Sequence, residues 1–210
     1  MRLEPFSLTG HHVALEPMSP EHVPDLVAAA TADRTTYGYT NVPGDAVTMA
    51  AYVDQLRNDA LHDAAVPFVQ RRVADGRLVG CTRFLNLAWW PHRPHPVEVE
   101  IGGTWLSADA QRTPINSEAK LLLLGHAFDD WGVHRVAICT DARNERSRAA
   151  IERLGATFEG VLRRHRASMG IATPAGTPRD TATYSIIPEE WPEIRARLAA
   201  RLTSMGAPRG

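Results

Sequence analysis

Residues 97–165 read VEVEIGGTWLSADAQRTPINSEAKLLLLGHAFDDWGVHRVAICTDARNERSRAAIERLGATFEGVLRRH. The spacing of their apolar side chains predicts, in order, a strand (97–106), a turn (111–116), a helix (117–132), a strand (135–141), a helix led by Asn144 (144–155) and a strand (156–165). That order predicts an α/β cleft into which the N-termini of both helices point.

The turn at 111–116 leads directly into a helix, which suits it to hold an anion. The first turn of a helix leaves about four backbone N–H groups unpaired and carries partial positive charge, so it favours phosphate. Gln111 and Arg112 add side-chain donors. Most helix N-termini bind only water, so a purely structural role stays open.

Asn144 has two possible roles at the start of the second helix. Asn is a favoured N-cap, Ser147 falls at the third helical position and Gly155 supplies a usual C-terminal stop. In the functional alternative, Asn144 hydrogen-bonds an amide-bearing ligand that lies across the sheet. Ser147 would then lie near a reacting sulfur, where a hydroxyl can protonate a departing thiolate.

Glu98 and Glu100 are the candidate general bases. They alternate with apolar residues, so both carboxylates lie on one face of the 97–106 strand. Burial in a partly dry cleft raises the pKa of a carboxyl group toward the working pH. The alternative is a solvated carboxylate or an ion pair with an arginine. We favour that alternative for Glu98 and leave both open for Glu100.

Length and charge limit the class of protein. The chain has 210 residues, of which 44% are hydrophobic and 22% charged, as expected for one compact globular domain. We expect a single domain over 1–203 and a flexible tail over 204–210. The formal net charge of −1 argues against a basic nucleic-acid binder.

The two cysteines, Cys81 and Cys139, lie in separate apolar segments and form no C-x-x-C pair. Buried free thiols in a reducing cytoplasm are therefore expected. The N-terminus shows no signal-peptide pattern, and every apolar run is shorter than the roughly 18–20 residues that a membrane span needs. We expect a cytoplasmic protein without a membrane partner.

The flanking sequence predicts further elements and no metal site. The expected elements are a strand (8–17), a helix from Ser19 to Ala30, a loop (31–44), a helix (45–60), a hairpin (67–73 and 77–87), a proline-rich loop (89–96), a strand (180–187) and a C-terminal helix (189–202). His11-His12 and the spaced His92 and His95 lack the additional ligands of a zinc site. The motifs of serine hydrolases, P-loop proteins and Rossmann folds are absent from the sequence.

Together these residues resemble the GNAT superfamily of acyl-CoA-dependent N-acyltransferases, and within it the RimJ/RimL-type ribosomal-protein N-terminal acetyltransferases. The motifs that carry the resemblance are IGGTWL (101–106), NSEAKLLLLGHAF (116–128), RVAICTDARNERSRAAIERLGATFEGVLRRH (135–165) and RDTATYSIIPEEW (179–191). The resemblance implies an α/β (α+β, three-layer) fold. Its central mixed, mostly antiparallel sheet would be splayed between the fourth and fifth strands, near 97–106 and 134–140, with helices on both faces.

The resemblance also implies a site. Glu100 and Ser147 would be catalytic, and acetyl-CoA or another acyl-CoA would be the co-substrate, without a metal. The implied acyl-CoA-binding residues are Thr104, Trp105, Leu106, Gln111, Arg112, Thr113, Ile115, Asn116, Ser117, Asn144 and Arg148. The acceptor, an amine-bearing small molecule or a protein N-terminus, would enter between 31–44, 89–96 and 166–180.

The phosphate loop departs from the pattern of the family, Q/R-x-x-G-x-G/A. Gln111 matches, but Pro114 and Asn116 replace small residues, and Pro114 removes one N–H donor. Two alternatives therefore stay open beside acetyl transfer. One is a succinyl-CoA-dependent transferase, because the polar loop at 166–180 and Arg163, Arg164 and Arg166 leave room for a carboxylate. The other is a non-catalytic acyl-CoA-binding module. A homodimer is also possible.

Overall fold

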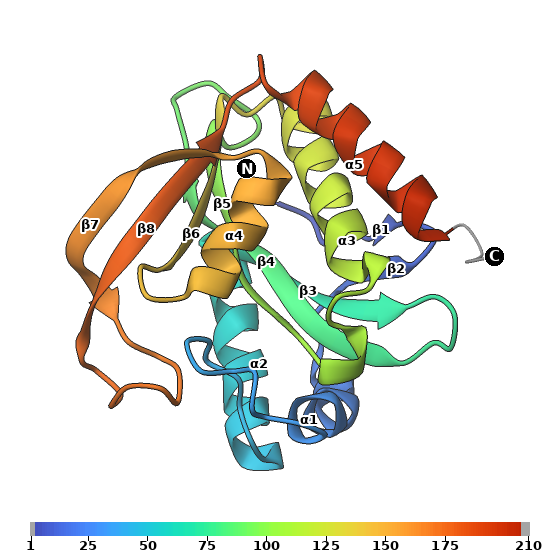
Figure 1. Cartoon of the computed structure of the whole chain (residues 1–210), viewed down its shortest axis with the longest axis vertical. Coiled ribbons are helices and arrows are strands. Elements are labelled where there is room, and N and C mark those ends of the chain that lie inside the picture. The colour runs from blue at the N-terminus through green and yellow to red at the C-terminus, as the bar shows by residue number, and fades with distance from the viewer. Residues whose placement is uncertain (1–2, 207–210) are drawn as a thin grey trace.

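The computed structural model describes residues 3–206 and contains one eight-stranded sheet in the order β1-β2-β3-β4-β5-β6-β8-β7 (Figure 1). The strands are β1 (Leu8–Thr9), β2 (Val13–Pro17), β3 (Ala65–Arg72), β4 (Leu78–Ala88), β5 (Glu98–Leu106), β6 (Arg135–Asp141), β7 (Thr157–Ala167) and β8 (Pro178–Ile186). The helices are α1 (Val23–Thr31), α2 (Ala46–Leu61), α3 (Pro114–Gly125), α4 (Glu145–Leu154) and α5 (Trp191–Gly206). Short 3-10 turns at Pro20–His22 and Ala108–Ala110 and a π turn at His126–Asp130 complete the elements.

The splay between β5 and β6 positions the site. These strands form the parallel pair of a sheet whose other pairings are antiparallel, and they pair only from Glu98–Arg135 to Glu100–Ala137. Beyond that point β5 continues along β4, and β6 continues along β8. Gly103 lies in this divergent part with a φ of 58°, a conformation that favours glycine. The mixed sheet and its splay confirm the predicted fold class.

Two apolar cores make the molecule three-layered. α3, α4 and α5 bury residues such as Leu123, Ile151 and Ile194 against one face of the sheet. α1 and α2 bury Leu26 and Val53 on the other face. Figure 1 shows α1 and α2 below the sheet and α3 and α5 above it. In residues 3–206 there is no helix long and apolar enough to cross a membrane.

Three sequence boundaries need correction. The strand expected over 8–17 is divided into β1 and β2, because the backbone N–H groups of His11, His12 and Val13 turn toward the buried carboxylate of Glu118. The helix expected over 117–132 begins at Pro114 and passes into a π turn after Gly125. α5 extends to Gly206, over the first residues of the expected tail 204–210; residues 207–210 lie outside the described part.

Candidate active site

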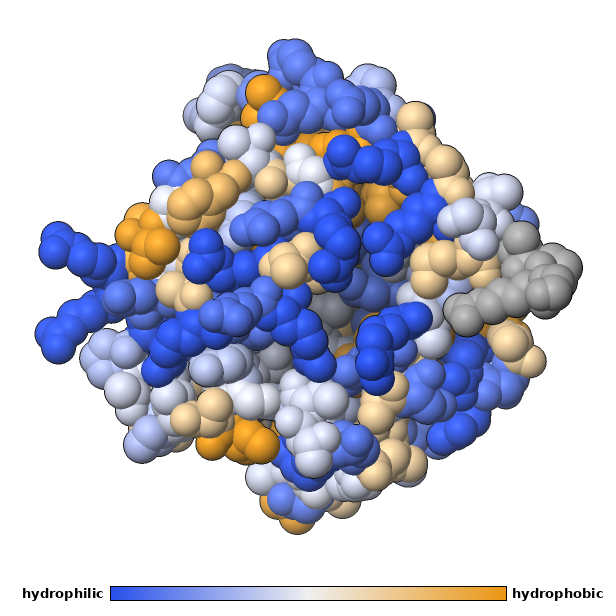
Figure 2. Space-filling view, viewed as in Figure 1, coloured by the Kyte–Doolittle hydropathy of each residue, from blue (hydrophilic) through white to orange (hydrophobic). Residues whose placement is uncertain are grey.

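A cleft of about 1120 Å³ occupies the splay and continues onto both faces of the sheet. Its walls come from β4, β5, β6, α2, α3, α4, α5, the segment 36–41 and the facing ends of β7 and β8. Hydrophilic side chains surround a hollow near the centre of the face seen in Figure 2. A cleft of this size is large enough for a cofactor-sized ligand.

The N-terminus of α3 opens into this cleft and explains Pro114. Thr113 is the N-cap: its hydroxyl oxygen accepts the N–H of Ile115 at 3.4 Å, and its hydroxyl donates to the carbonyl of Ala110 at 2.6 Å. Pro114 is therefore the first helical residue, where an N–H has no intrahelical partner. The sequence placed Pro114 and Asn116 in the turn before the helix, which is wrong, because both belong to the first turn of α3.

Most of the predicted site residues come together. Those that line the cleft are Glu100, Thr104, Trp105, Leu106, Gln111, Arg112, Thr113, Asn116, Ser117, Asn144 and Ser147. Ile115 and Arg148 are not among the lining residues. Ile115 is buried in the core. The Nε of Arg148 donates to the hydroxyl of Tyr184 at 3.1 Å, and its guanidinium lies over the ring of Phe158.

Asn144 performs the capping role. Its side-chain oxygen accepts the N–H of Ser147 at 3.1 Å, and Gly155 ends α4 with a φ of 97°. Because the cap uses only the oxygen, the side-chain amide group of Asn144 can still donate to a ligand. The part-buried Ser147 lines the same wall.

Both candidate bases are ion-paired. Arg166 donates to the two carboxylate oxygens of Glu100 at 2.9 and 2.6 Å, and Asn86 donates to Oε2 at 2.8 Å. Glu98 accepts from Arg135 at 3.2 Å. An ion pair with an arginine is the alternative favoured from the sequence for Glu98, and it is one of the two roles left open for Glu100. A carboxylate has about four acceptor sites, so Oε1 of Glu100 keeps one for a water or a substrate.

Lys120 is a site residue that sequence reasoning missed. It is the only lysine in the sequence and lines the cleft from the second turn of α3. Its ammonium donates to the hydroxyl of Thr104 at 3.2 Å. Burial lowers the pKa of Lys120 to about 8, and no carboxylate among residues 3–206 forms an ion pair with it. On the same helix, Oδ1 of Asn116 is buried without a hydrogen-bond partner from residues 3–206.

The cleft is strongly cationic although the chain is nearly neutral. Its charged lining residues are one carboxylate, Glu100, and the cations Arg83, Arg112, Lys120, Arg146, Arg153, Arg166, Arg179, Arg197 and Arg201. Among these cations only Arg166 forms an ion pair within residues 3–206. The arginines come from six different elements or loops, so no local sequence pattern could have identified them as a group.

The predicted acceptor loops are only partly in place. Segments 36–41 and 166–169 line the cleft, but no residue of 89–96 does. In that loop the ring of Trp90 packs against His134, with the ring centroids 5.0 Å apart, and His95 stacks on Trp131. The aromatic residues therefore hold the proline-rich loop against the end of α3 and away from the site.

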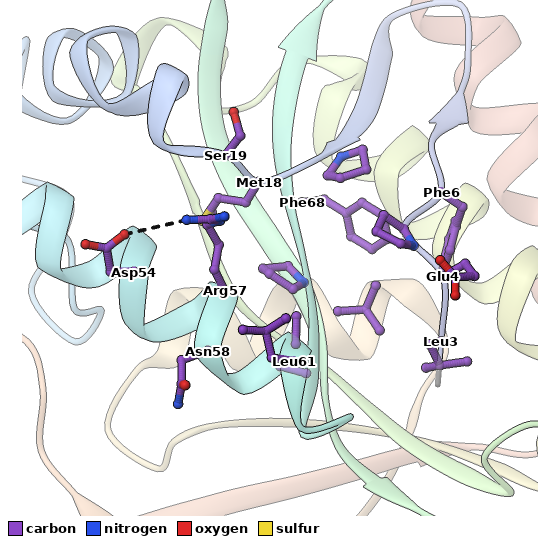
Figure 3. Close-up of a pocket in the computed structure, with 16 residues that line it drawn as sticks. Leu3, Glu4, Phe6, Met18, Ser19, Asp54, Arg57, Asn58, Leu61 and Phe68 are labelled. Carbon is purple, nitrogen blue, oxygen red and sulfur yellow. Dashed lines mark ion pairs between the residues drawn. The ribbon is translucent and has the colours of Figure 1, made fainter. Parts of the chain in front are cut away.

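A second cavity, of about 580 Å³, lies elsewhere (Figure 3). The N-terminal segment, α2 and β3 enclose it, and it shares no lining residue with the cleft. The labelled Leu3, Phe6, Leu61 and Phe68 make it largely apolar, and Arg57 pairs with Asp54 at its rim. The candidate chemistry is concentrated in the splay.

Known proteins share this arrangement. The family model of the acetyltransferase (GNAT) domain matches residues 12–157. The Bacillus subtilis (strain 168) protein named "Putative ribosomal N-acetyltransferase YdaF" is 34% identical over 117 residues, which are 56% of this chain and 57% of that protein. The match thus spans little more than half of the curated relative.

Solved structures extend the likeness to nearly the whole chain. A GCN5-related N-acetyltransferase from Brucella melitensis is 26% identical with a TM-score of 0.82, over 96% of this chain and 87% of that one. RimJ of Mycobacterium smegmatis, in complex with CoA-disulfide, is 23% identical with a TM-score of 0.76, over 94% and 95% of the two chains, which shows the fold alone. By its family match and its splayed sheet, this chain belongs to the GNAT acetyltransferase family.

Proposed function

We propose that the protein transfers an acetyl group from acetyl-CoA to a primary amine by direct attack of the amine on the thioester. The observation that carries the proposal is the N-terminus of α3 opening into a cationic cleft where β5 and β6 diverge. The CoA-disulfide complex of RimJ and the acetyltransferase name of YdaF support it.

The donor half of the cleft would hold acyl-CoA. The diphosphate would accept hydrogen bonds from the first turn of α3, with Gln111 and Arg112 beside it. On the same helix, the ammonium of Lys120 is a hydrogen-bond donor and Oδ1 of Asn116 is an acceptor for other groups of the ligand. Beyond Glu100 the edge of β5 no longer pairs with β6, so its backbone is open to the amides of the pantetheine arm.

The chemistry needs a proton path and a polarised carbonyl. Backbone N–H groups of the divergent part of β5 would stabilise the oxyanion. Ser147, at the wall formed by α4, would protonate the CoA thiolate as it leaves. Glu100 would take the proton of the amine through the acceptor site left on Oε1. Alignment of the two bound reactants would supply much of the rate.

Two classes of acceptor fit the proposal. A protein N-terminus fits the ribosomal name of YdaF, and an amine-bearing small molecule fits the size of the cleft. A cytoplasmic location and a homodimer stay predictions from the sequence.

Thermal shift with acetyl-CoA, succinyl-CoA and free CoA tests the proposal. A ligand at about 100 times its dissociation constant stabilises the folded state by roughly 2.7 kcal/mol, enough to raise Tm visibly. We expect a shift with each ligand and acetyl transfer to at least one amine. A larger shift with succinyl-CoA would favour the succinyl alternative. Binding without turnover against a broad amine panel would favour the non-catalytic module, and no shift would end the proposal.

A further inference from the structure

The half of the cleft proposed to receive the acceptor is lined by Arg83, Arg166, Arg179 and Glu100, so two of its three guanidiniums have no carboxylate among the described residues to neutralise them. Arg179, at the start of β8, lines the cleft part-buried and donates from Nε to the hydroxyl of Thr181 at 3.3 Å. Within residues 3–206 it forms no ion pair. A part-buried arginine without a counter-ion carries a desolvation cost that a bound anion would relieve.

The neighbouring carboxylates are already engaged. Glu100 is held by both terminal nitrogens of Arg166. Asp141 is held by Arg143, which donates from Nε at 2.9 Å and from a terminal nitrogen at 2.8 Å. The charges of both carboxylates are therefore already balanced by other arginines, and neither forms an ion pair with Arg179 within residues 3–206. Burial and then the positive charge of Arg166 lower its pKa, while Asp141, Cys139 and Glu100 act in the opposite direction.

The opposite wall adds to the positive charge. Arg83 of β4 lines the cleft, and its terminal nitrogen donates to the hydroxyl of Tyr52 at 3.2 Å. Counting Arg83, Arg166 and Arg179 against Glu100, this half of the lining carries a net charge of about +2. This positive charge would repel a polycationic amine, because the lining of the cleft offers no carboxylate other than Glu100, which is already paired with Arg166.

We infer that the acceptor amine carries a carboxylate, and that Arg179 binds this carboxylate at the acceptor mouth of the cleft. Arginine presents a planar fork of N–H donors that matches a carboxylate bidentately, and Arg179 still has its two terminal nitrogens for that purpose. The inference rests on the proposed function, since it specifies the acceptor of that same reaction. It favours amino-acid-like or acidic peptide acceptors over polyamines and cationic sugars.

The test measures binding and does not need the natural acceptor. Three conjugates join the sulfur of CoA through an S–CH2–CO linker to glycine, glycinamide or ethylenediamine, so that they end in a carboxylate, a neutral amide or an ammonium. Their dissociation constants, and that of CoA, are measured by calorimetry with the whole chain. We expect the glycine conjugate to bind roughly 10- to 100-fold more tightly than the glycinamide conjugate. The ethylenediamine conjugate should bind most weakly.

Two variants assign the effect. Arg179→Gln should remove the preference for the carboxylate while leaving the Kd of CoA within about twofold, which also shows that the variant is folded. Arg163→Gln, at an exposed position of β7 that does not line the cleft, should keep the preference. Equal binding of the glycine and glycinamide conjugates to the wild type, or a preference that persists in Arg179→Gln, overturns the inference.

Titrations of acetyl-CoA and succinyl-CoA beside the conjugates separate the acceptor from the donor as the source of the carboxylate. If succinyl-CoA gains affinity over acetyl-CoA through Arg179 and the glycine conjugate does not, the carboxylate belongs to the acyl group and the inference is wrong. Failure of CoA itself to bind the wild type removes the proposed function, and the acceptor with it. Binding of CoA without a carboxylate preference removes only the inference.

Discussion

The donor half of the cleft and its acceptor half are assembled in different ways. The half proposed to hold the donor takes Thr104, the first turn of α3 and Lys120 from one short stretch, and it includes Oδ1 of Asn116, which has no hydrogen-bond partner within residues 3–206. The acceptor half joins β4, β5, β7, β8 and the 36–41 loop, and the pair Glu100–Arg166 spans 66 positions of the chain. The donor half is thus locally encoded, while the acceptor half depends on long-range ion pairs.

Breaking the long-range pair should give the largest effect. We expect Arg166→Met to lower the free energy of unfolding by about 3–5 kcal/mol, because Glu100 then keeps a buried charge without its counter-ion. Urea denaturation followed by circular dichroism measures this. Arg163→Met, at an exposed position of the same strand, should change the free energy by less than about 0.5 kcal/mol. Equal, small effects of both variants would show that the pair does not hold the acceptor half.

Glu100→Gln separates positioning from proton transfer at that pair. If Glu100 is the proton acceptor, the variant should lower kcat by roughly 10²–10⁴-fold and leave KM for acetyl-CoA unchanged, as steady-state kinetics would measure. A variant that loses stability but keeps the kcat of the wild type would leave Glu100 as a positioning residue for Arg166.

The difference between the halves explains how far the sequence could be interpreted. The strand 135–141, the cap at Asn144 and the stop at Gly155 were predicted correctly, because an apolar run, a capping side chain and a left-handed glycine are local signals. The start of α3 was predicted at Ser117 instead of Pro114, because the sequence alone did not identify Thr113 as the N-cap.

The missed residues have a common physical reason. α3 is apolar on several faces, so its sequence does not show that Lys120 points into the cleft. Arg179 lies one residue before the expected strand 180–187, and Arg166 and Glu100, which share the cleft with it, come from other strands. The family therefore follows from local pattern, whereas the ion pairs and arginines that line the cleft need the tertiary structure.

Lys120→Met tests the proposed donor half by two measurements, the pH dependence of stability and the affinity for CoA. Lowering the pKa of Lys120 from 10.5 to about 8 corresponds to a penalty of up to roughly 3 kcal/mol at 1.36 kcal/mol per pH unit. The penalty is full below pH 8, where the folded state carries the buried charge. It decreases as pH rises toward 10.5, so the stability of the free wild type should increase over that range. The variant should be more stable than the wild type at pH 7 and lose this dependence, as thermal denaturation across pH 7–10.5 would show.

The same variant should bind CoA about tenfold more weakly at pH 7, because the ammonium no longer meets the ligand. The affinity of the wild type should also fall as pH rises above about 8, where Lys120 loses its proton. A stabilised variant with unchanged affinity would mean that Lys120 lies beside the ligand without contacting it.

Ser147→Ala tests the wall shared by both halves. If the hydroxyl of Ser147 protonates the CoA thiolate, its loss should lower kcat roughly 10- to 100-fold, which raises the barrier by about 1.4–2.7 kcal/mol. The KM of either substrate should change little. Steady-state kinetics would measure it, with Ser204→Ala, at an exposed position of α5, as the matched control. An unchanged kcat would assign protonation of the thiolate to solvent or another group.

Asn144 gives the smallest effect and the finest distinction, because its capping oxygen and its amide group can be removed separately. Asn144→Asp keeps an oxygen for the N–H of Ser147, so stability should stay within about 0.5 kcal/mol, while Asn144→Ala should cost about 1 kcal/mol. If the amide group donates to the pantetheine arm, both variants should weaken CoA binding several-fold by calorimetry. If Asn144→Asp binds CoA as tightly as the wild type, the role of Asn144 is limited to capping α4. The sequence pattern at Asn144 would then have identified the start of a helix and not a ligand contact.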